Sequence, residues 1–451
     1  MVPEQVLAEL RATLRGAVLA PGDLGYDDTR QIFNAMIDSR PVLIARCATA
    51  ADVVACVGFA QAHGLVVSAR GGGHNVSGKA VVDGGLMIDL LPMKSCRIDP
   101  MRRTARAEPG LTLAEFDHDC QAFGLTTPMG AISATGIAGL TLGGGFGWLS
   151  GKYGLACDNL LSVDIVTADG QLRTASHSEH PDLFWAVRGG GANVGIVTSF
   201  EYRLHEVGPV LGGGIVFPFA KAKRVLAFYD EFARGCPDEL SVNAALWTAA
   251  DGVPVVGIAV AWCGELNVGE RVLEPLRGFE TPLADTIAPM RYIDRQRTSD
   301  SFFPHGRRHY WKAGWQRRLA STAIEVMVEF AARRPSPYTR LSLQQMHGAA
   351  ARVPPTATAF AHRHDQWEVQ ILSQWLYAAD DGPNVRWARA CHAALEPYLD
   401  RAVYVNNLGD DESDRVSEAY GSNYERLAAI KAVYDPANFF RSNQNVVTMP
   451  R

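Results

Sequence analysis

The sequence has no apolar stretch long enough to cross a membrane, no long run of like charge and no CxxC pair. A membrane-spanning helix needs about 20 apolar residues, so we expect no membrane partner. A net charge of −5, from 43 basic and 48 acidic residues, excludes the basic footprint of a nucleic-acid-binding protein. The eight cysteines lie far apart, which disfavours a zinc site and a disulfide framework and predicts a protein of the reducing cytoplasm.

Alternating apolar runs and helical patterns predict an α+β fold of two or three structural units. Residues 1–19 predict a short amphipathic helix without the apolar core of a signal peptide. Thr49 is a plausible N-cap for a helix that ends before Gly64. Further predicted strands are 41–46, 64–69, 160–167, 195–203, 240–247, 255–262 and 403–406, and further predicted helices are 182–188, 220–233, 322–332 and 420–433.

Three consecutive glycines, Gly71 to Gly73, follow the strand predicted at 64–69 and precede His74. Without side chains, backbone N–H groups can approach an anion such as a pyrophosphate closely. A tight turn with a solvent-facing histidine is the alternative that a bare glycine run leaves open. The segment 73–79 also matches most of a P-loop, but Ala80 has no hydroxyl for a magnesium ion.

Two more glycine clusters lie at 131–154 and 189–195. Residues 143–147 do not give the GxGxxG pattern between a strand and a helix, so a Rossmann dinucleotide site is excluded. The cluster at 131–154 is too rich in glycine to predict a regular element. One extended, phosphate-bearing cofactor contacted by several loops explains all three clusters.

Several long motifs occur in one order and carry a resemblance. The motifs are Arg70-Gly-Gly-Gly-His-Asn75, the segments 135–145, 152–155 and 157–159, and the C-terminal segments 420–427, 434–441 and 443–445. They resemble the FAD-binding domain of the vanillyl-alcohol oxidase superfamily, berberine bridge enzyme-like branch, from about residue 25 to the end. The resemblance implies a FAD-binding domain split between 1–206 and 401–451. Between these parts it implies a substrate domain, 207–400, with an antiparallel sheet covered by helices.

His74 stands where this family attaches the flavin covalently. A neutral imidazole is a competent nucleophile near pH 7. Many members carry a second link from a cysteine, but Ile132 or Ser133 stands at that position here, so we expect a single histidyl link. The implied cofactor contacts are His74, Arg70, Gly71, Gly72, Gly73, Asn75, Ser77, Pro128, Gly130, Thr135, Gly136, Gly139, Gly143, Gly144, Tyr153, Gly154, Asp158, Gly195, Val197, Tyr404 and Asn406.

The segment 367–375 resembles the family strand that lies over the flavin. With a period of two, Glu368, Gln370, Leu372 and Gln374 share one face. Gln370 aligns with the family's catalytic base, but glutamine cannot accept a proton at neutral pH. The catalytic set is therefore predicted as Gln370 with a tyrosine; Tyr424 and Tyr153 are the first candidates and Tyr404 another, with a packing role as the alternative for each.

The predicted reaction is oxidation of an alcohol or amine in a small organic substrate, with hydride passing to covalent FAD and oxygen giving hydrogen peroxide. A secondary-metabolite substrate, a small residue at Thr135 for oxygen access, and a monomer or homodimer are expected. The alternatives are a flavin dehydrogenase for a sugar or alcohol, with another electron acceptor, and a non-catalytic flavin-binding protein. No metal is expected, because His362, His364 and Asp365 lack a recognised ligand spacing.

Overall fold

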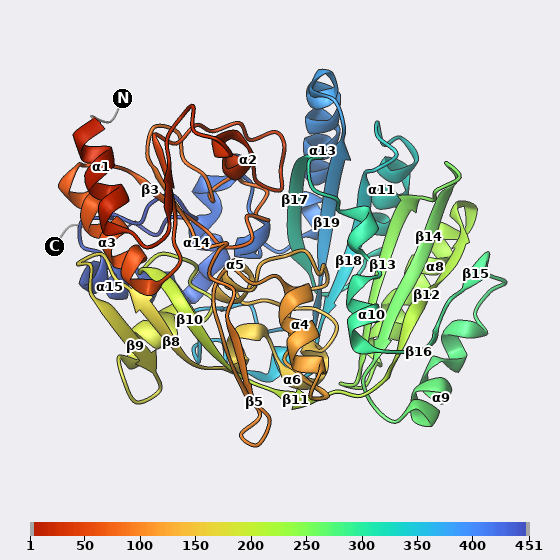
Figure 1. Ribbon diagram of the computed structural model, residues 1–451. Coiled ribbons are helices and arrows are strands. Elements are labelled where there is room, and N and C mark those ends of the chain that lie inside the picture. The colour runs from red at the N-terminus through yellow and green to blue at the C-terminus, as the bar shows by residue number, and fades with distance from the viewer. Residues whose placement is uncertain (1–3, 448–451) are drawn as a thin grey trace.

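The computed structural model describes residues 4–447 of the chain, which form two halves side by side (Figure 1). The N-terminal and C-terminal segments build one half, and the middle of the chain builds the other. No helix in the described part of the chain is both long and apolar enough to cross a bilayer. The α+β class predicted from the sequence is confirmed.

A four-stranded sheet opens the first half. Its order is β1 (Ala17–Leu19), β2 (Leu43–Arg46), β4 (Leu86–Asp89) and β3 (Val67–Arg70), with β4 parallel to both β2 and β3. Helix α3 (Ala50–Ala62) connects β2 to β3, and Thr49 and Asp52 form the capping box at its start, as the N-cap pattern predicts. Because β3 ends at Arg70, the glycine run leaves the sheet at its edge.

The second sheet of this half is antiparallel. Its strand order is β5 (Cys96–Asp99), β6 (Thr104–Ala107), β10 (Ile196–Arg203), β8 (Leu160–Val166) and β9 (Leu172–Ser176), with a small pair, β7 (Leu125–Thr126) and β11 (His205–Glu206), beside it. Helix α3 packs between this five-stranded sheet and the four-stranded sheet of the same half. Shorter helices connect these strands: α2 (Tyr26–Arg30), α4 (Leu113–Gln121), α5 (Ile137–Leu142), α6 (Ser150–Tyr153) and α7 (Pro181–Val187).

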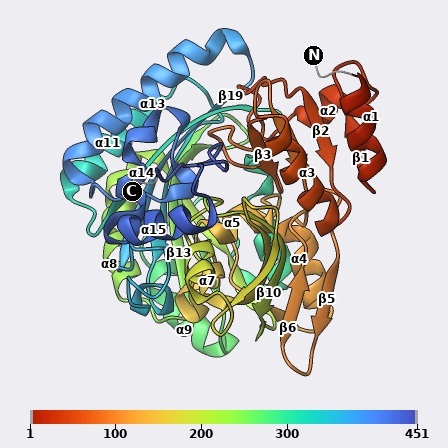
Figure 2. The ribbon, with the colours of Figure 1, turned by 90° about the vertical axis from the view of Figure 1, so that its left-hand side faces the viewer.

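The second half is an eight-stranded antiparallel sheet. Its order is β15 (Ala284–Asp285), β12 (Val210–Pro218), β14 (Pro254–Trp262), β13 (Leu240–Thr248), β18 (Arg340–Met346), β19 (Gln366–Trp375) and β17 (Arg308–Gln316), with β16 (Ala288–Met290) on β12. Helices α8 (Ala222–Arg234), α11 (Ser321–Ala332) and α13 (Asp381–Leu395) cover its outer face (Figure 2). The inner face is turned toward the first half and is free to form a binding site.

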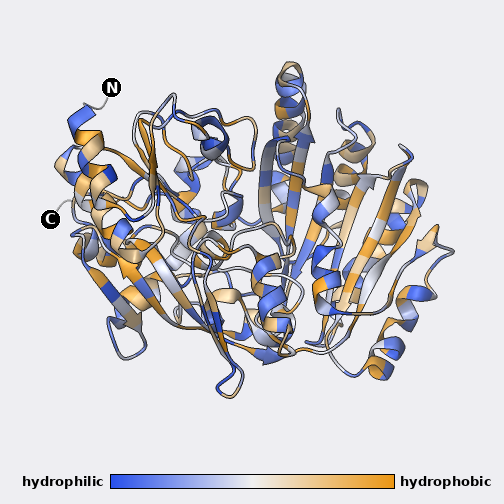
Figure 3. Ribbon diagram, viewed as in Figure 1, coloured by the Kyte–Doolittle hydropathy of each residue, from blue (hydrophilic) through white to orange (hydrophobic). Residues whose placement is uncertain are grey.

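The core follows this division. The central strands of the large sheet are mostly apolar, whereas α9 (Leu266–Arg277) and α13 carry much polar surface (Figure 3). One cluster of buried side chains lies between the large sheet and its helices. Another joins the antiparallel sheet of the first half to the C-terminal helices α14 (Val416–Tyr420) and α15 (Tyr424–Tyr434). The chain therefore returns to its first half at the end, and the boundaries 1–206, 207–400 and 401–451 stay our proposal.

Four sequence predictions about local structure are wrong. Helix α1 (Glu4–Thr13) ends before Leu19, because Ala17 to Leu19 pair with β2 instead. Residues 403–406 find no partner strand, and a 3-10 turn forms at Val405–Asn407. The helix predicted at 420–433 is interrupted by Gly421, whose φ is +50°. The glycine-rich segment 131–154 does contain regular structure, α5 and α6.

Candidate active site

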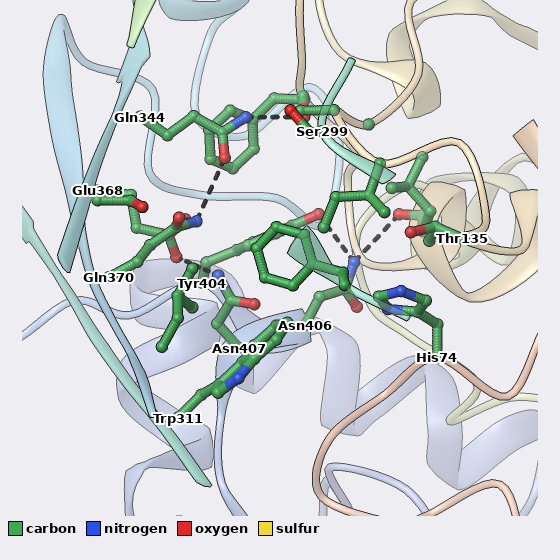
Figure 4. A pocket seen from close by; sticks show the side chains of 18 of the residues that line it. His74, Thr135, Ser299, Trp311, Gln344, Glu368, Gln370, Tyr404, Asn406 and Asn407 are labelled. Carbon is green, nitrogen blue, oxygen red and sulfur yellow. Dashed lines mark hydrogen bonds between the residues drawn. The ribbon is translucent and has the colours of Figure 1, made fainter. Parts of the chain in front are cut away.

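A cavity of about 520 Å³ lies between the glycine loops of the first half and the inner face of the large sheet. This volume is within the range of small-molecule and cofactor sites. Figure 4 shows Glu368 and Gln370 on one side of the cavity and His74 and Thr135 on the other, with Tyr404 between them. Both halves and the C-terminal segment therefore contribute to a single site.

The glycine wall of the cavity is built by the close approach of two loops. A Cβ atom added at Gly72 would lie 2.5 Å from the backbone nitrogen of Gly136, so only glycine permits this contact. Gly139 differs, because a Cβ atom there would meet no atom within 4 Å, although the residue lines the cavity. This wall presents backbone rather than side chains, which suits an extended ligand with a pyrophosphate.

His74 lies at the edge of the glycine wall with its ring stacked on Phe33 at a centroid distance of 3.8 Å. His309 stacks on Phe33 at 4.3 Å. Burial lowers the pKa of His74 to about 4, so the imidazole is neutral at pH 7. Its Nε2 atom is buried and has no hydrogen-bond partner among residues 4–447. A neutral, unpartnered imidazole nitrogen on a cavity wall is available to a ligand.

The C-terminal segment enters the cavity through Tyr404 and Asn406. The Tyr404 hydroxyl accepts hydrogen bonds from the Gly145 backbone N–H, at 3.0 Å, and from Asn406 Nδ2, at 2.8 Å. Asn75 Nδ2 donates to the Asn406 carbonyl oxygen at 3.1 Å. Burial raises the pKa of Tyr404 above its ordinary value, so this phenol is neutral and holds the segment against the loops.

Glu368 is the acidic residue among those that line the cavity. Its side chain is fully buried, and its two carboxylate oxygens accept hydrogen bonds from Asn407 Nδ2 and Gln370 Nε2, each at 2.7 Å. Gln370 Nε2 also lies 3.2 Å from Gln344 Oε1. Burial raises the pKa of Glu368 to about 7, although the two amide donors oppose the rise. This carboxyl is poised to exchange a proton near neutral pH.

Three of the four side chains that were predicted to share one face of β19 line the cavity. Glu368, Gln370 and Leu372 line it, whereas Gln374 lies beyond its edge and accepts a hydrogen bond from Arg307. Glu368 was predicted to lie on this face, but no role was predicted for it. The available signal was a carboxylate two residues before Gln370 on one strand, but its burial could not be known.

The structure brings together about half of the predicted cofactor contacts. Those that line the cavity are Gly71, Gly72, Gly73, His74, Asn75, Gly130, Thr135, Gly136, Gly139, Tyr404 and Asn406. Those outside the lining are Arg70, Ser77, Pro128, Gly143, Gly144, Tyr153, Gly154, Asp158, Gly195 and Val197.

Several of the outlying residues support the site from behind. Arg70 forms an ion pair with Asp89 at 2.8 Å and donates to the Thr29 carbonyl oxygen. Asp158 forms a buried ion pair with Arg363 at 2.7 Å. These contacts fix the loops that carry the glycines.

The two tyrosines predicted first as catalytic lie away from the cavity. Tyr153 stacks on His205 at 4.0 Å, and its hydroxyl donates to the Glu206 carbonyl oxygen at 3.4 Å. Burial raises the pKa of Tyr153 to about 12. The Tyr424 hydroxyl accepts a hydrogen bond from the Val447 backbone N–H. Of the predicted catalytic residues, Gln370 and the further tyrosine candidate, Tyr404, line the cavity.

Many other lining residues were missed, several of them from the large sheet. They include Asn243, Trp247, Trp311, Arg340, Ser342, Gln344 and Asn407. Alternation along β13 and β18 could have placed Asn243, Trp247, Arg340, Ser342 and Gln344 on one face, but no motif marks that face as the one that binds a ligand. Ile132 also lines the cavity, none of the eight cysteines does, and Ser133 instead bonds to Asp300. Within residues 4–447 no cluster of His, Cys, Asp or Glu is arranged to hold a metal ion.

Comparison with known proteins agrees with this geometry. Residues 41–176 match the family model for a FAD binding domain, and residues 403–447 match the model described as berberine and berberine like. The chain is 33% identical to (R)-6-hydroxynicotine oxidase of Paenarthrobacter nicotinovorans, over 96% of this chain and 97% of that one. It is 30% identical to a FAD-linked oxidoreductase of Dictyostelium discoideum, over 98% and 97%. The crystal structure of 6-hydroxy-D-nicotine oxidase from Arthrobacter nicotinovorans superposes with a TM-score of 0.87 at 31% identity, covering 96% of this chain and 98% of that one.

Proposed function

Because the chain belongs to the berberine bridge enzyme-like FAD-linked oxidoreductases of the vanillyl-alcohol oxidase superfamily, we propose that it is a FAD-dependent oxidase. It removes a hydride and a proton from an alcohol or amine of a small organic molecule, and oxygen is reduced to hydrogen peroxide. The observation that carries this proposal is the position of Glu368, a buried carboxyl with a pKa of about 7, across one cavity from His74 and the glycine wall.

The residues present fit FAD. Gly71 to Gly73, Gly136 and Gly139 form a wall without side chains for the pyrophosphate. FAD, when bound, supplies a two-electron acceptor for hydride. His74 would hold it covalently, which its neutral ring and the unpartnered Nε2 atom support. A single link is proposed, because no cysteine lines the cavity.

Glu368 would act as the proton acceptor. In its ionised form the carboxylate takes the proton from the substrate O–H or N–H group as the neighbouring C–H bond gives up hydride and a C=O or C=N bond forms. Gln370 and Asn407 donate to the two carboxylate oxygens at 2.7 Å and hold the group in one orientation. Gln370, which cannot ionise, is thus a positioning residue for the base rather than the base itself.

Denaturation in acid tests the cofactor assignment. We expect flavin absorbance to stay with the precipitated wild-type protein and to leave with the supernatant for His74→Ala. His309→Ala is the matched control, because His309 stacks on the other face of Phe33 but does not line the cavity. Flavin released from the wild type would refute the covalent link, and a protein that binds no FAD would refute the function.

Oxygen reactivity tests the choice of oxidase. The holoenzyme is reduced without air by an alcohol or amine from a substrate panel, and air is then admitted. Rapid return of the oxidised flavin spectrum with one hydrogen peroxide per turnover is the expected result. Return over minutes, with faster reoxidation by an artificial acceptor, would instead make the protein a dehydrogenase.

A further inference from the structure

Arg340 is a cation without an acidic partner on the wall of the cavity. It begins β18 on the inner face of the large sheet, and its guanidinium carbon lies 4.0 Å from the Phe302 ring centroid and 5.5 Å from that of Trp247. Its side chain forms no ion pair and no hydrogen bond with residues 4–447. Cation–π contacts of this kind offset only part of the cost of burying a charge.

Two fully buried arginines of the chain are paired with carboxylates, whereas the half-buried Arg340 is not. Arg363 binds Asp158, and Arg70 binds Asp89. Burial lowers the pKa of Arg340 to about 10, so the group is still charged at neutral pH. An arginine that stays charged inside a cavity, with its donors free, is arranged to meet an anion.

A second arginine adds to the positive charge of this wall. Arg295, on helix α10 (Tyr292–Arg297), is 1% exposed and also lines the cavity. Its Nε atom donates to the Val260 carbonyl oxygen at 2.7 Å and its guanidinium carbon lies 3.5 Å from the Trp148 ring centroid, while Nη2 has no partner in the described part of the chain. Lys79, the third cationic residue of the lining, is already paired with Asp410.

The sheet register places this cation away from the proposed base. Arg340 pairs with Leu372, whereas Glu368 pairs with Gln344. Four residues along a strand span about 13 Å at a rise of roughly 3.3 Å per residue. A substrate that reaches both groups therefore carries its anion at one end and its oxidisable carbon at the other.

We propose that Arg340 is a specificity-determining residue that binds a carboxylate of the substrate, and that the substrate is an aromatic acid packed against Phe302 and Trp247. This inference rests on the proposed oxidase function and names its substrate class. The glycine wall on the opposite side serves the phosphates of the cofactor, so the arginine is left for the substrate.

Calorimetric titration of the FAD-loaded protein with benzoate and with benzamide tests the inference. The two probes have nearly the same shape and differ in charge. We expect benzoate to bind at least about tenfold more tightly, as a charge-assisted bidentate contact allows. Arg340→Gln should abolish this preference and Arg340→Lys should retain part of it.

Arg334→Gln is the matched control and should keep the full preference. Arg334 is also a half-buried arginine without an ion pair, but it donates to Thr248 and does not line the cavity. Equal binding of the two probes, no binding of either, or a preference that survives Arg340→Gln would overturn the inference. Loss of FAD from Arg340→Gln would overturn it as well, because the arginine would then serve the cofactor. All these outcomes are measured as binding. Failure of the proposed oxidase function is measured as a lack of turnover and of hydrogen peroxide, so the two failures can be distinguished.

Discussion

Replacing Glu368 by glutamine tests the central step of the proposed mechanism. The substitution keeps the size of the side chain and removes the group that takes the proton. Positioned general bases contribute about 10²- to 10⁴-fold to the rate of proton transfer, so we expect kcat/KM of Glu368→Gln to fall by a factor in that range. Because the pKa of Glu368 is about 7, wild-type kcat/KM should also decline below pH 7, and this acid limb should vanish in the variant.

The same substitution should lower activity but stabilise the protein at high pH. Burial raises the pKa of Glu368 from 4.5 to about 7, so the folded protein binds this proton more tightly than the unfolded chain. Stability therefore falls as pH rises from about 4.5 to about 7, and each pKa unit is worth about 1.4 kcal/mol. The carboxylate costs about 3 kcal/mol of stability above pH 7 and none below about pH 4.

Chemical denaturation of both proteins at pH 4 and pH 8 measures this cost. The free energy of unfolding of Glu368→Gln relative to the wild type should increase by about 3 kcal/mol between the two pH values. The comparison across pH does not depend on whether the new amide finds partners, because an amide does not titrate and any such loss is the same at both pH values. A variant that loses activity and gains relative stability at high pH would show that the protein retains a destabilising carboxylate for function.

Asp117→Asn is the matched control for this experiment. Asp117 is also buried, its pKa is also raised to about 7 by burial, and it accepts a hydrogen bond from Thr126. It does not line the cavity. This variant should show a similar pH-dependent change in stability with an unchanged acid limb in kcat/KM. If both variants keep the wild-type pH profile, Glu368 is not the base and the mechanism is refuted.

Two further predictions concern the walls of the site. Gly139→Leu should lower FAD content at least tenfold, as read by flavin absorbance per protein, because the side chain would fill the cavity. Gly58→Leu, also on a helix with no neighbour within 4 Å, should bind FAD normally, and equal loss from both would contradict the assignment of the wall. Asp158→Asn should lower the free energy of unfolding by about 3–5 kcal/mol in chemical denaturation, because it leaves Arg363 buried and unpaired. A change below 1 kcal/mol would contradict this.

Many helices and strands of the first half could be predicted because residues close in the sequence determine them. Thr49 caps α3 through its own side chain, and the apolar runs of β8 and β10 are distinct enough to be recognised as strands. Strand prediction failed at 403–406, where the residue types favour a strand but no neighbouring strand is available. Pairing is a property of the folded chain, so propensity alone could not reveal it.

The glycine loops were predicted well as a group and less well one by one. A glycine is required at Gly72 because a neighbouring loop backbone lies against it, and at Gly144 because the Phe360 ring does. Only the first of these two lines the cavity. A glycine in the sequence indicates that there is no room for a side chain at that position. It does not indicate whether the neighbouring atoms belong to the protein or to a ligand.

Glu368 and Gln370 show where sequence reasoning about the chemistry stops. The period of two placed both side chains on one face of β19, and alignment with the family pointed to Gln370. What decides between them is that Glu368 is fully buried and bound by amides from Gln370 and Asn407. The donor Asn407 lies 39 residues further along the chain, directly after the segment 403–406 that was predicted to be a strand. Burial raises the pKa of Glu368, and the return of the C-terminal segment onto the sheet orients its carboxylate. The base that we propose could therefore be identified only once these contacts were known.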